Sequence, residues 1–135
     1  MSCVPATHAQ QFVRLSWLSC LSSLYGFYRG YYDLALVPGG VWLTSYIYWT
    51  KNDYSIWRYI DIVYVNIGLG YSLYRATASS NKELYFLIKL IAILFFIGAV
   101  YTSKKQLLDE SFYLHCLLHI VGNIGNIVLY SGHFT

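Results

Sequence analysis

Long apolar runs, separated by short clusters of charged and turn-forming residues, dominate the chain. Three of these runs are bracketed by Lys, Arg, Asp or Glu and cover residues 55–75, 84–102 and 111–131. A transmembrane helix needs about 20 mostly apolar residues to cross a hydrocarbon core about 30 Å thick. The pattern therefore predicts that each of these runs is a helix that spans a membrane.

The apolar stretch over residues 11–50 is too long for a single span. Its only polar break is Arg-Gly-Tyr-Tyr-Asp at residues 29–33. We therefore predict two further spans, over residues 12–28 and 34–50, and expect Pro38 and the two glycines after it to weaken the first turns of the second. The expected fold is an all-α bundle of five transmembrane helices in a single multi-pass domain over residues 1–135, or of four helices if this stretch crosses once.

Composition supports a membrane class. Hydrophobic residues make up 57% of the chain and charged residues only 11%, whereas a soluble globular chain has about 25% charged residues. The net charge of +3 is small and scattered, which argues against a nucleic-acid partner. Cys3, Cys20 and Cys116 are odd in number and form no CxxC pair, so we interpret them as reduced thiols. The expected partner is a lipid bilayer.

Loop charge orients the predicted spans. With five spans, one group of cations shares the side of the N-terminus and a second group shares the opposite side. The groups are Arg14, Lys51, Lys104 and Lys105, and Arg29, Arg75 and Lys82. Because cytoplasmic loops carry the excess of Lys and Arg, this bias favours an integral membrane protein with a cytoplasmic N-terminus.

Ionisable side chains inside the predicted spans are candidate functional residues. Each costs about 2.5–3.5 kcal/mol or more near the bilayer centre, and such residues are functional by default. They are Arg58, Asp61, Lys89, His115 and His119. Arg58 precedes Asp61 by three residues, so an ion pair on one helix face is one interpretation of Asp61. We expect Lys89 to extend toward the nearer membrane interface.

Polar groups of three predicted spans fall at one depth. Counted at 1.5 Å per residue from the start of each span, Asp61 lies about 9 Å deep, and His115 and His119 about 6 and 12 Å deep. Ser16 and Cys20 belong to the same layer. His115 and His119 are four residues apart, so both imidazoles share a helix face and can hold one metal ion. Asp61 would be a third ligand or would orient a histidine.

The run HCLLHIVGNIGNIVLY, which begins at His115, resembles the last helix of the alkaline ceramidase and adiponectin-receptor superfamily of membrane hydrolases. In that superfamily an HxxxH pair on the final span binds zinc. SWLSC at residues 16–20 resembles the superfamily's SxxxH element, with Cys20 at the position of the third zinc-binding histidine. The resemblance covers these two segments, and the superfamily has seven spans.

This resemblance implies zinc-dependent hydrolysis of lipid amides or esters. His115 and His119 would be zinc ligands, with Cys20 as the substitute third ligand. The superfamily's aspartate maps onto either Asp33 or Asp61, and Asp61 is our candidate catalytic residue together with Ser16. A serine nucleophile would also need a base within reach.

The same residues also support a structural interpretation. Intramembrane polar side chains can join helices by hydrogen bonds, and the histidine pair would then be such a joint. We expect Asn66, Asn123 and nearby glycines to bring spans 55–75 and 111–131 into contact, and Asp33 to cap the span that follows it. The alternative function is a non-enzymatic structural or assembly protein of an organelle or virion membrane, with a membrane-protein partner or a second copy of itself. A small channel formed by oligomerisation is a third hypothesis.

Overall fold

The computed structural model describes residues 5–53 and 55–134, and within these ranges the chain forms five α-helices and no strand. The helices are α1 (Ala6–Tyr28), α2 (Tyr32–Lys51), α3 (Ile56–Ala76), α4 (Lys82–Lys104) and α5 (Leu108–Ser131). The predicted all-α class is confirmed, and the polar break at residues 29–33 does divide the first long stretch into two helices. Cys3 lies outside the described residues.

Two of these helices, α4 and α5, are long and apolar enough to cross a membrane, as judged over the described residues. α1, α2 and α3 have comparable lengths but are less apolar: α1 contains four serines, α2 the run Pro38-Gly39-Gly40, and α3 four tyrosines. The fold is therefore a helical bundle with two candidate membrane-spanning helices.

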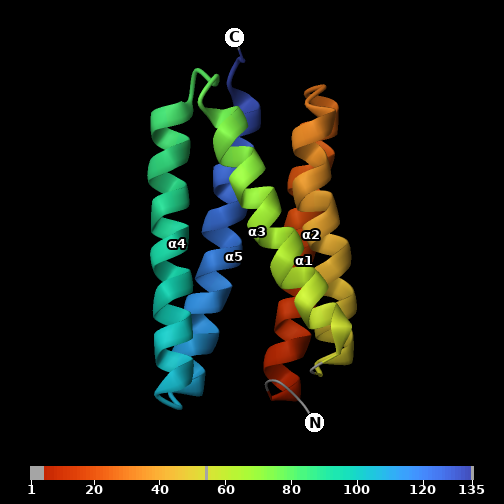
Figure 1. Ribbon diagram of the computed structural model, residues 1–135, viewed down its shortest axis with the longest axis vertical. Helices are drawn as coiled ribbons and strands as arrows, with labels where there is room; N and C mark the ends of the chain where they lie inside the picture. Colours follow the sequence, from red (N-terminus) through yellow and green to blue (C-terminus); the bar gives the residue numbers. More distant parts are fainter. Residues whose placement is uncertain (1–4, 54, 135) are drawn as a thin grey trace.

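The helices pack as two antiparallel hairpins and one oblique helix (Figure 1). α1 packs against α2, α4 packs against α5, and a contact between α1 and α5 joins the two hairpins. α3 lies against α2 at its start, then crosses the front of the molecule and approaches α4 only near its end. The first and last described residues lie at opposite ends of the bundle.

A glycine turn separates α1 from α2. The Tyr31 amide donates to the Gly26 carbonyl, and the Gly30 amide donates to the Phe27 carbonyl, each at 3.0 Å. This pair of bonds is the Schellman motif, which requires a left-handed residue at its corner. Gly30 supplies that conformation with a φ of 83°, which explains why the helix ends in the middle of an apolar stretch.

Pro38 lies inside α2, and the helix continues through it. Because proline has no amide hydrogen, it leaves the carbonyl four residues earlier, that of Leu34, without its helical partner. The Tyr130 hydroxyl of α5 donates to this carbonyl at 3.0 Å. The expected weakness of the first turns of α2 is thus offset by a bond between helices.

The expected contact between spans 55–75 and 111–131 is not made through their asparagines. Asn66 is exposed and donates to the Ile62 carbonyl of its own helix. Asn123 contacts α1 instead, where it accepts a hydrogen bond from Ser22 at 2.7 Å. The prediction was wrong because matching depth does not determine which helices are neighbours: α3 packs mainly against α2, whereas α5 packs against α4 and α1.

Candidate functional site

The two histidines of α5 form the candidate site. The Nε2 atoms of His115 and His119 lie 3.1 Å apart, and their rings are stacked with centroids 4.9 Å apart. At this distance the two nitrogens share one hydrogen, so one imidazole is the donor and the other the acceptor. The four-residue spacing therefore does bring the two rings together on one helix face.

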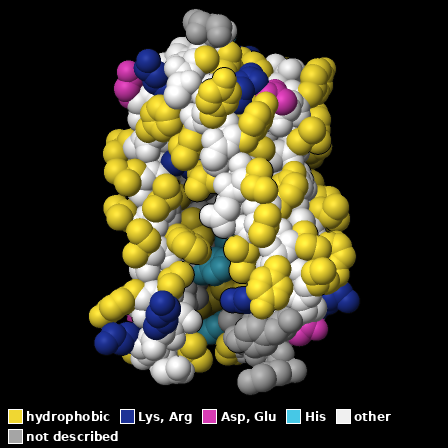
Figure 2. Space-filling view, in the orientation of Figure 1, with side chains coloured by type: hydrophobic (Ala, Val, Ile, Leu, Met, Phe, Trp, Pro, Cys, Tyr) yellow, Lys and Arg dark blue, Asp and Glu magenta, His cyan; other side chains and the backbone are white. Residues whose placement is uncertain are grey.

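Aromatic side chains of α1 and α2 surround the histidine pair. Phe12 packs on the His115 ring with centroids 4.2 Å apart and lies 6.3 Å from the His119 ring. Trp49 meets the His115 ring edge-on at 5.7 Å. On the face drawn in Figure 2, histidine side chains lie in a hollow between α3 and the α4–α5 hairpin. The site therefore has aromatic walls and one side that opens laterally between helices.

The predicted third metal ligand does not join this pair. Among residues 5–53 and 55–134, no three His, Cys, Asp or Glu side chains are grouped so that they could hold a metal ion. Cys20 is a half-buried free thiol on α1. A hydrolytic zinc site uses three protein ligands and an open position, and these residues supply only two converging donors. The described side chains therefore fit a metal incompletely.

Asp61 is held on α2 rather than turned to the histidines. Its Oδ1 accepts hydrogen bonds from the hydroxyls of Thr44 and Ser45 at 2.7 and 2.8 Å. All three residues are buried. Thr44 and Ser45 are adjacent polar residues in an apolar run, a pattern that indicates a polar contact on this face of α2.

Ser16, the candidate nucleophile, is fully buried on α1. Its hydroxyl donates to the Val13 carbonyl of its own helix at 2.6 Å. A nucleophilic serine has to give its proton to a neighbouring base, whereas this proton is directed at a backbone oxygen. The geometry thus resembles that of a polar residue within a packed helix.

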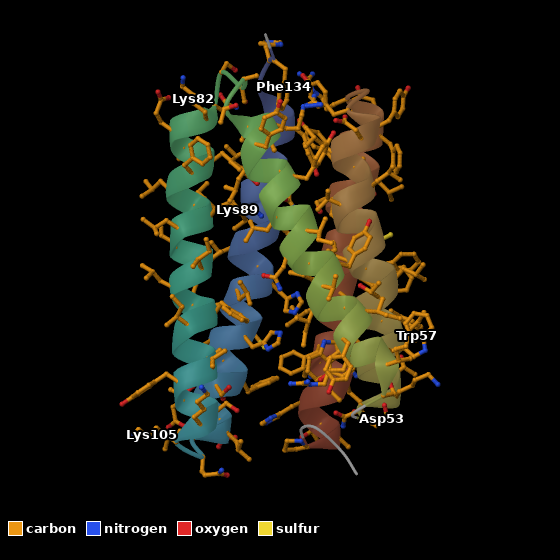
Figure 3. The ribbon with its side chains drawn as sticks, viewed as in Figure 1. Asp53, Trp57, Lys82, Lys89, Lys105 and Phe134 are labelled. Carbon is orange, nitrogen blue, oxygen red and sulfur yellow. The ribbon has the colours of Figure 1, made fainter. Side chains whose placement is uncertain are left out.

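Lys89 connects α4 to α5 instead of extending to the interface as expected. Its Nζ donates to the Gly122 carbonyl and to Asn126 Oδ1, each at 3.0 Å. It also lies 5.6 Å from the centroid of the Tyr85 ring. Figure 3 shows Lys89 between the two helices, well inside the level of Lys82 at the start of α4. The polar groups that hold this lysine inward belong to α5, the helix that packs against α4.

Asp33 joins α2 to α3 at the end of the bundle and does not cap α2. The helix begins after Tyr31 without a side-chain cap, and the Asp33 carboxylate is bonded to Tyr71 and Arg75 of α3. Partial burial raises the pKa of Asp33, but the Tyr71 hydrogen bond and the Arg75 charge outweigh it and hold this pKa below its usual range. Tyr71 and Arg75 are four residues apart, a spacing that could have revealed this contact.

Comparison with known proteins identifies no relative. The chain matches no protein-family model, no curated protein and no solved structure. The resemblance to the alkaline ceramidase and adiponectin-receptor superfamily stays a prediction from residues 16–20 and the run that begins at His115.

Proposed function

We propose that the chain is an integral membrane protein with five spans, and that its intramembrane polar side chains join the helices rather than catalyse a reaction. Its role would then be structural or assembly-related. The observation that carries this proposal is the distribution of side chains: many of the buried side chains are polar, and many large apolar side chains are exposed. Such a distribution is favourable only where the surroundings are themselves apolar.

Helix α1 illustrates this distribution. Ser16 and Ser22 are 0% and 1% exposed, whereas Trp17 and Leu21 are 49% and 61% exposed. In water, exposing a large apolar side chain forfeits about 1.5–3 kcal/mol of burial free energy. α1 therefore has the solvation pattern of a lipid-facing helix, although its serines weaken its apolar composition.

Helices α2 and α3 repeat the pattern. Their buried contact contains Thr44, Ser45 and Asp61, while Leu36 and Ile67 are among their exposed side chains. On the face drawn in Figure 2, charged side chains gather toward the two ends of the bundle and hydrophobic side chains cover most of the surface between them. This banding is what a bilayer with aqueous surfaces on both sides requires.

The candidate catalytic groups favour the structural role. Asp61 is bonded to two hydroxyls, and Ser16 is bonded to its own helix. The Asn123 amide is likewise engaged, with Ser22 and the His119 carbonyl. Each of these groups already has a hydrogen-bond partner within the bundle. These contacts therefore support a role in helix packing more than a role in catalysis.

Cysteine accessibility tests the five-span arrangement. Single cysteines at Tyr28, Lys51, Thr77 and Lys105, introduced into a chain whose native cysteines are replaced by serine, would be labelled with a membrane-impermeant maleimide in sealed vesicles. Five spans place Tyr28→Cys and Thr77→Cys on one side and Lys51→Cys and Lys105→Cys on the other. If only α4 and α5 cross, Tyr28→Cys, Lys51→Cys and Thr77→Cys share one side, which would contradict the proposal.

A zinc-dependent hydrolase of lipid amides or esters is the second candidate function, because of the histidine geometry. Two nitrogens bound to one tetrahedral zinc at about 2.0–2.1 Å are about 3.3 Å apart, and the two Nε2 atoms are already 3.1 Å apart. If bound, zinc would acidify a water molecule for attack on an ester or amide. In this role, Phe12 and Trp49 would restrict rotation of the rings.

Metal content separates the two candidate functions. The detergent-purified chain would be dialysed against a weak chelator and analysed by mass spectrometry, beside His115→Ala and His119→Ala. About one zinc per chain, lost in both variants, would favour the hydrolase. A folded wild type without metal would support the structural proposal. Asn66→Ala is the matched control, since it changes an exposed polar residue of another helix.

A further inference from the structure

An apolar groove runs along the outer side of α3, beside α2. It has a volume of about 520 Å³, within the range of about 300–1,000 Å³ that is typical of small-molecule sites. Its walls are aliphatic and aromatic and include Val37, Tyr59, Val63, Tyr64, Ile67 and Tyr71. The groove therefore offers a long apolar surface to whatever surrounds the helix.

Two of the three tyrosines at this groove, Tyr64 and Tyr71, direct their hydroxyls away from an occupant. Tyr64 donates to the Leu36 carbonyl at 2.7 Å, and Tyr71 donates to Asp33. Their aromatic rings line the groove while their polar atoms are bonded to α2. Gly40 lets the Tyr64 side chain lie against α2, because a Cβ at that position would collide with the Tyr64 hydroxyl. The wall is thus held against α2 and apolar from Tyr64 to Tyr71.

A cation lies at one end of the groove. Tyr64, Tyr71 and Arg75 follow one another at helical spacing on one face of α3, so the apolar stripe ends in a guanidinium. Arg75 Nη1 contacts Asp33, and its guanidinium carbon lies 5.2 Å from the centroid of the Phe134 ring. Figure 3 labels Phe134 at that end of the bundle. The side chain is 30% exposed, and arginine has five N–H donors, so Arg75 has donors left for an anion.

The groove spans a length suited to a lipid chain. Tyr59 and Tyr71 are twelve residues apart, which corresponds to about 18 Å along a helix. This is more than half of a hydrocarbon core of about 30 Å. An apolar slot of that length with a cation at its outer end complements a molecule with an acyl chain and an anionic head.

From this arrangement we propose that the α2–α3 groove binds one membrane phospholipid, with an acyl chain along Val63 and Ile67 and the phosphate at Arg75. The inference rests on the proposed five-span placement, which puts the groove in the hydrocarbon core and Arg75 at its surface. Charge complementarity selects an anionic lipid: Arg29, Arg75 and Lys82 outnumber Asp33 and Glu83 at this end. The Asp33 charge weakens the attraction without removing it.

Native mass spectrometry tests the site. The detergent-purified chain is mixed with dioleoylphosphatidylglycerol or with dioleoylglycerol, which has the same chains and no phosphate. We expect the wild type to retain one phosphatidylglycerol, and Arg75→Gln to retain about fivefold less, as for one cation near a lipid surface. Asp33→Asn removes the competing charge and should raise retention. Lys105→Gln is the control, since it removes one exposed cation at the opposite end of the bundle.

A second variant tests the apolar part of the groove. Val63→Trp fills it and should abolish retention of both lipids, whereas Ile62→Trp adds the same ring to the neighbouring exposed residue, which does not line the groove. Helix content and elution volume of each variant would be compared with the wild type to establish that it folds.

Three results would overturn the lipid site. These are equal retention of the two lipids by the wild type, equal loss in Ile62→Trp and Val63→Trp, and a dimer that Val63→Trp dissociates, which would make a second copy the occupant. If maleimide labelling places the four single cysteines as five spans require but the chain retains no lipid, only the lipid site is contradicted. If labelling places Tyr28→Cys, Lys51→Cys and Thr77→Cys on one side, the five-span placement itself is contradicted.

Discussion

The α2–α3 contact and the α4–α5 contact hold neighbouring helices together by different interactions. α2 and α3 are joined by short polar side chains, where Thr44 and Ser45 donate to Asp61. α4 and α5 approach through small residues, among which Ala92 and Ala99 are buried. At Gly125, an added Cβ would lie 3.2 Å from Ile88. One long cation, Lys89, is their main polar connection.

This difference explains why α4 and α5 are more apolar in sequence than α2 and α3. α4 and α5 can be apolar on nearly every side, since close backbone approach supplies their packing. α2 and α3 contain the polar groups of their contact within the helix, and those groups reduce the apolar signal by which spans are detected. A helix with a weak apolar signal can therefore be the one with stronger specific bonds.

Removing Asp61 should produce the largest effect. Asp61→Ala leaves two buried hydroxyls without their acceptor and should lower the free energy of unfolding by about 2 kcal/mol. Asp61→Asn keeps an acceptor oxygen and should recover at least half of that loss. Equilibrium unfolding in mixed detergent and dodecyl sulfate measures both. An Asp61→Ala protein as stable as the wild type would remove the distinction between the two contacts.

Replacing Asn123 should have an intermediate effect on the free energy of unfolding, and Asn66 provides the comparison. Asn123→Ala removes the bond from Ser22 that joins α1 to α5 and should cost about 1 kcal/mol. Asn66→Ala changes an exposed residue whose amide bonds its own helix and should cost less than about 0.5 kcal/mol. The same unfolding assay compares them. Equal losses would mean that Asn66 also joins helices, as depth alone suggested.

Replacing Lys89 should cost little, in contrast to Asp61. Lys89→Met keeps a side chain of similar length between α4 and α5 and removes a charge that is costly to desolvate. We therefore expect a change in unfolding free energy of less than about 0.5 kcal/mol. Asn126→Leu provides the contrast, because it leaves Lys89 in place without one of its two acceptors. A loss in Lys89→Met as large as in Asp61→Ala would show that α4 and α5 also depend on polar bonds.

The sequence predicted the helices well because each signal was local. Charged brackets marked the ends of the runs, and the residues around Gly30 marked the turn between α1 and α2. His115 and His119 could be paired because four-residue spacing is a property of a single helix. The partners of Asp61 and Asn123 could not be predicted, since they depend on which helices are neighbours, α3 with α2 and α5 with α1, and no local pattern encodes that choice.

The smallest expected effect concerns the outer end of the α2–α3 contact, at Asp33. Burial raises the Asp33 pKa, but Tyr71 and Arg75 more than compensate and hold it below 3.8. The folded chain thus binds fewer protons here than the unfolded chain, so this contact contributes stability above the usual carboxyl range and loses it as pH falls through the folded pKa. Asp33 is 40% exposed, so screening keeps the contribution small.

Asp33→Asn isolates this contribution from the other carboxylates, because it keeps an acceptor for Tyr71 while removing one titrating group. Unfolding free energies would be measured from about pH 7 to about pH 3, and the variant should lose less stability on acidification than the wild type. Parallel pH curves would mean that Arg75 does not favour the ionised Asp33. The guanidinium would then be available to a lipid phosphate without competition, and Asp33→Asn should leave phosphatidylglycerol retention unchanged. A shallower curve together with raised retention would show that one arginine serves both the helix contact and the groove.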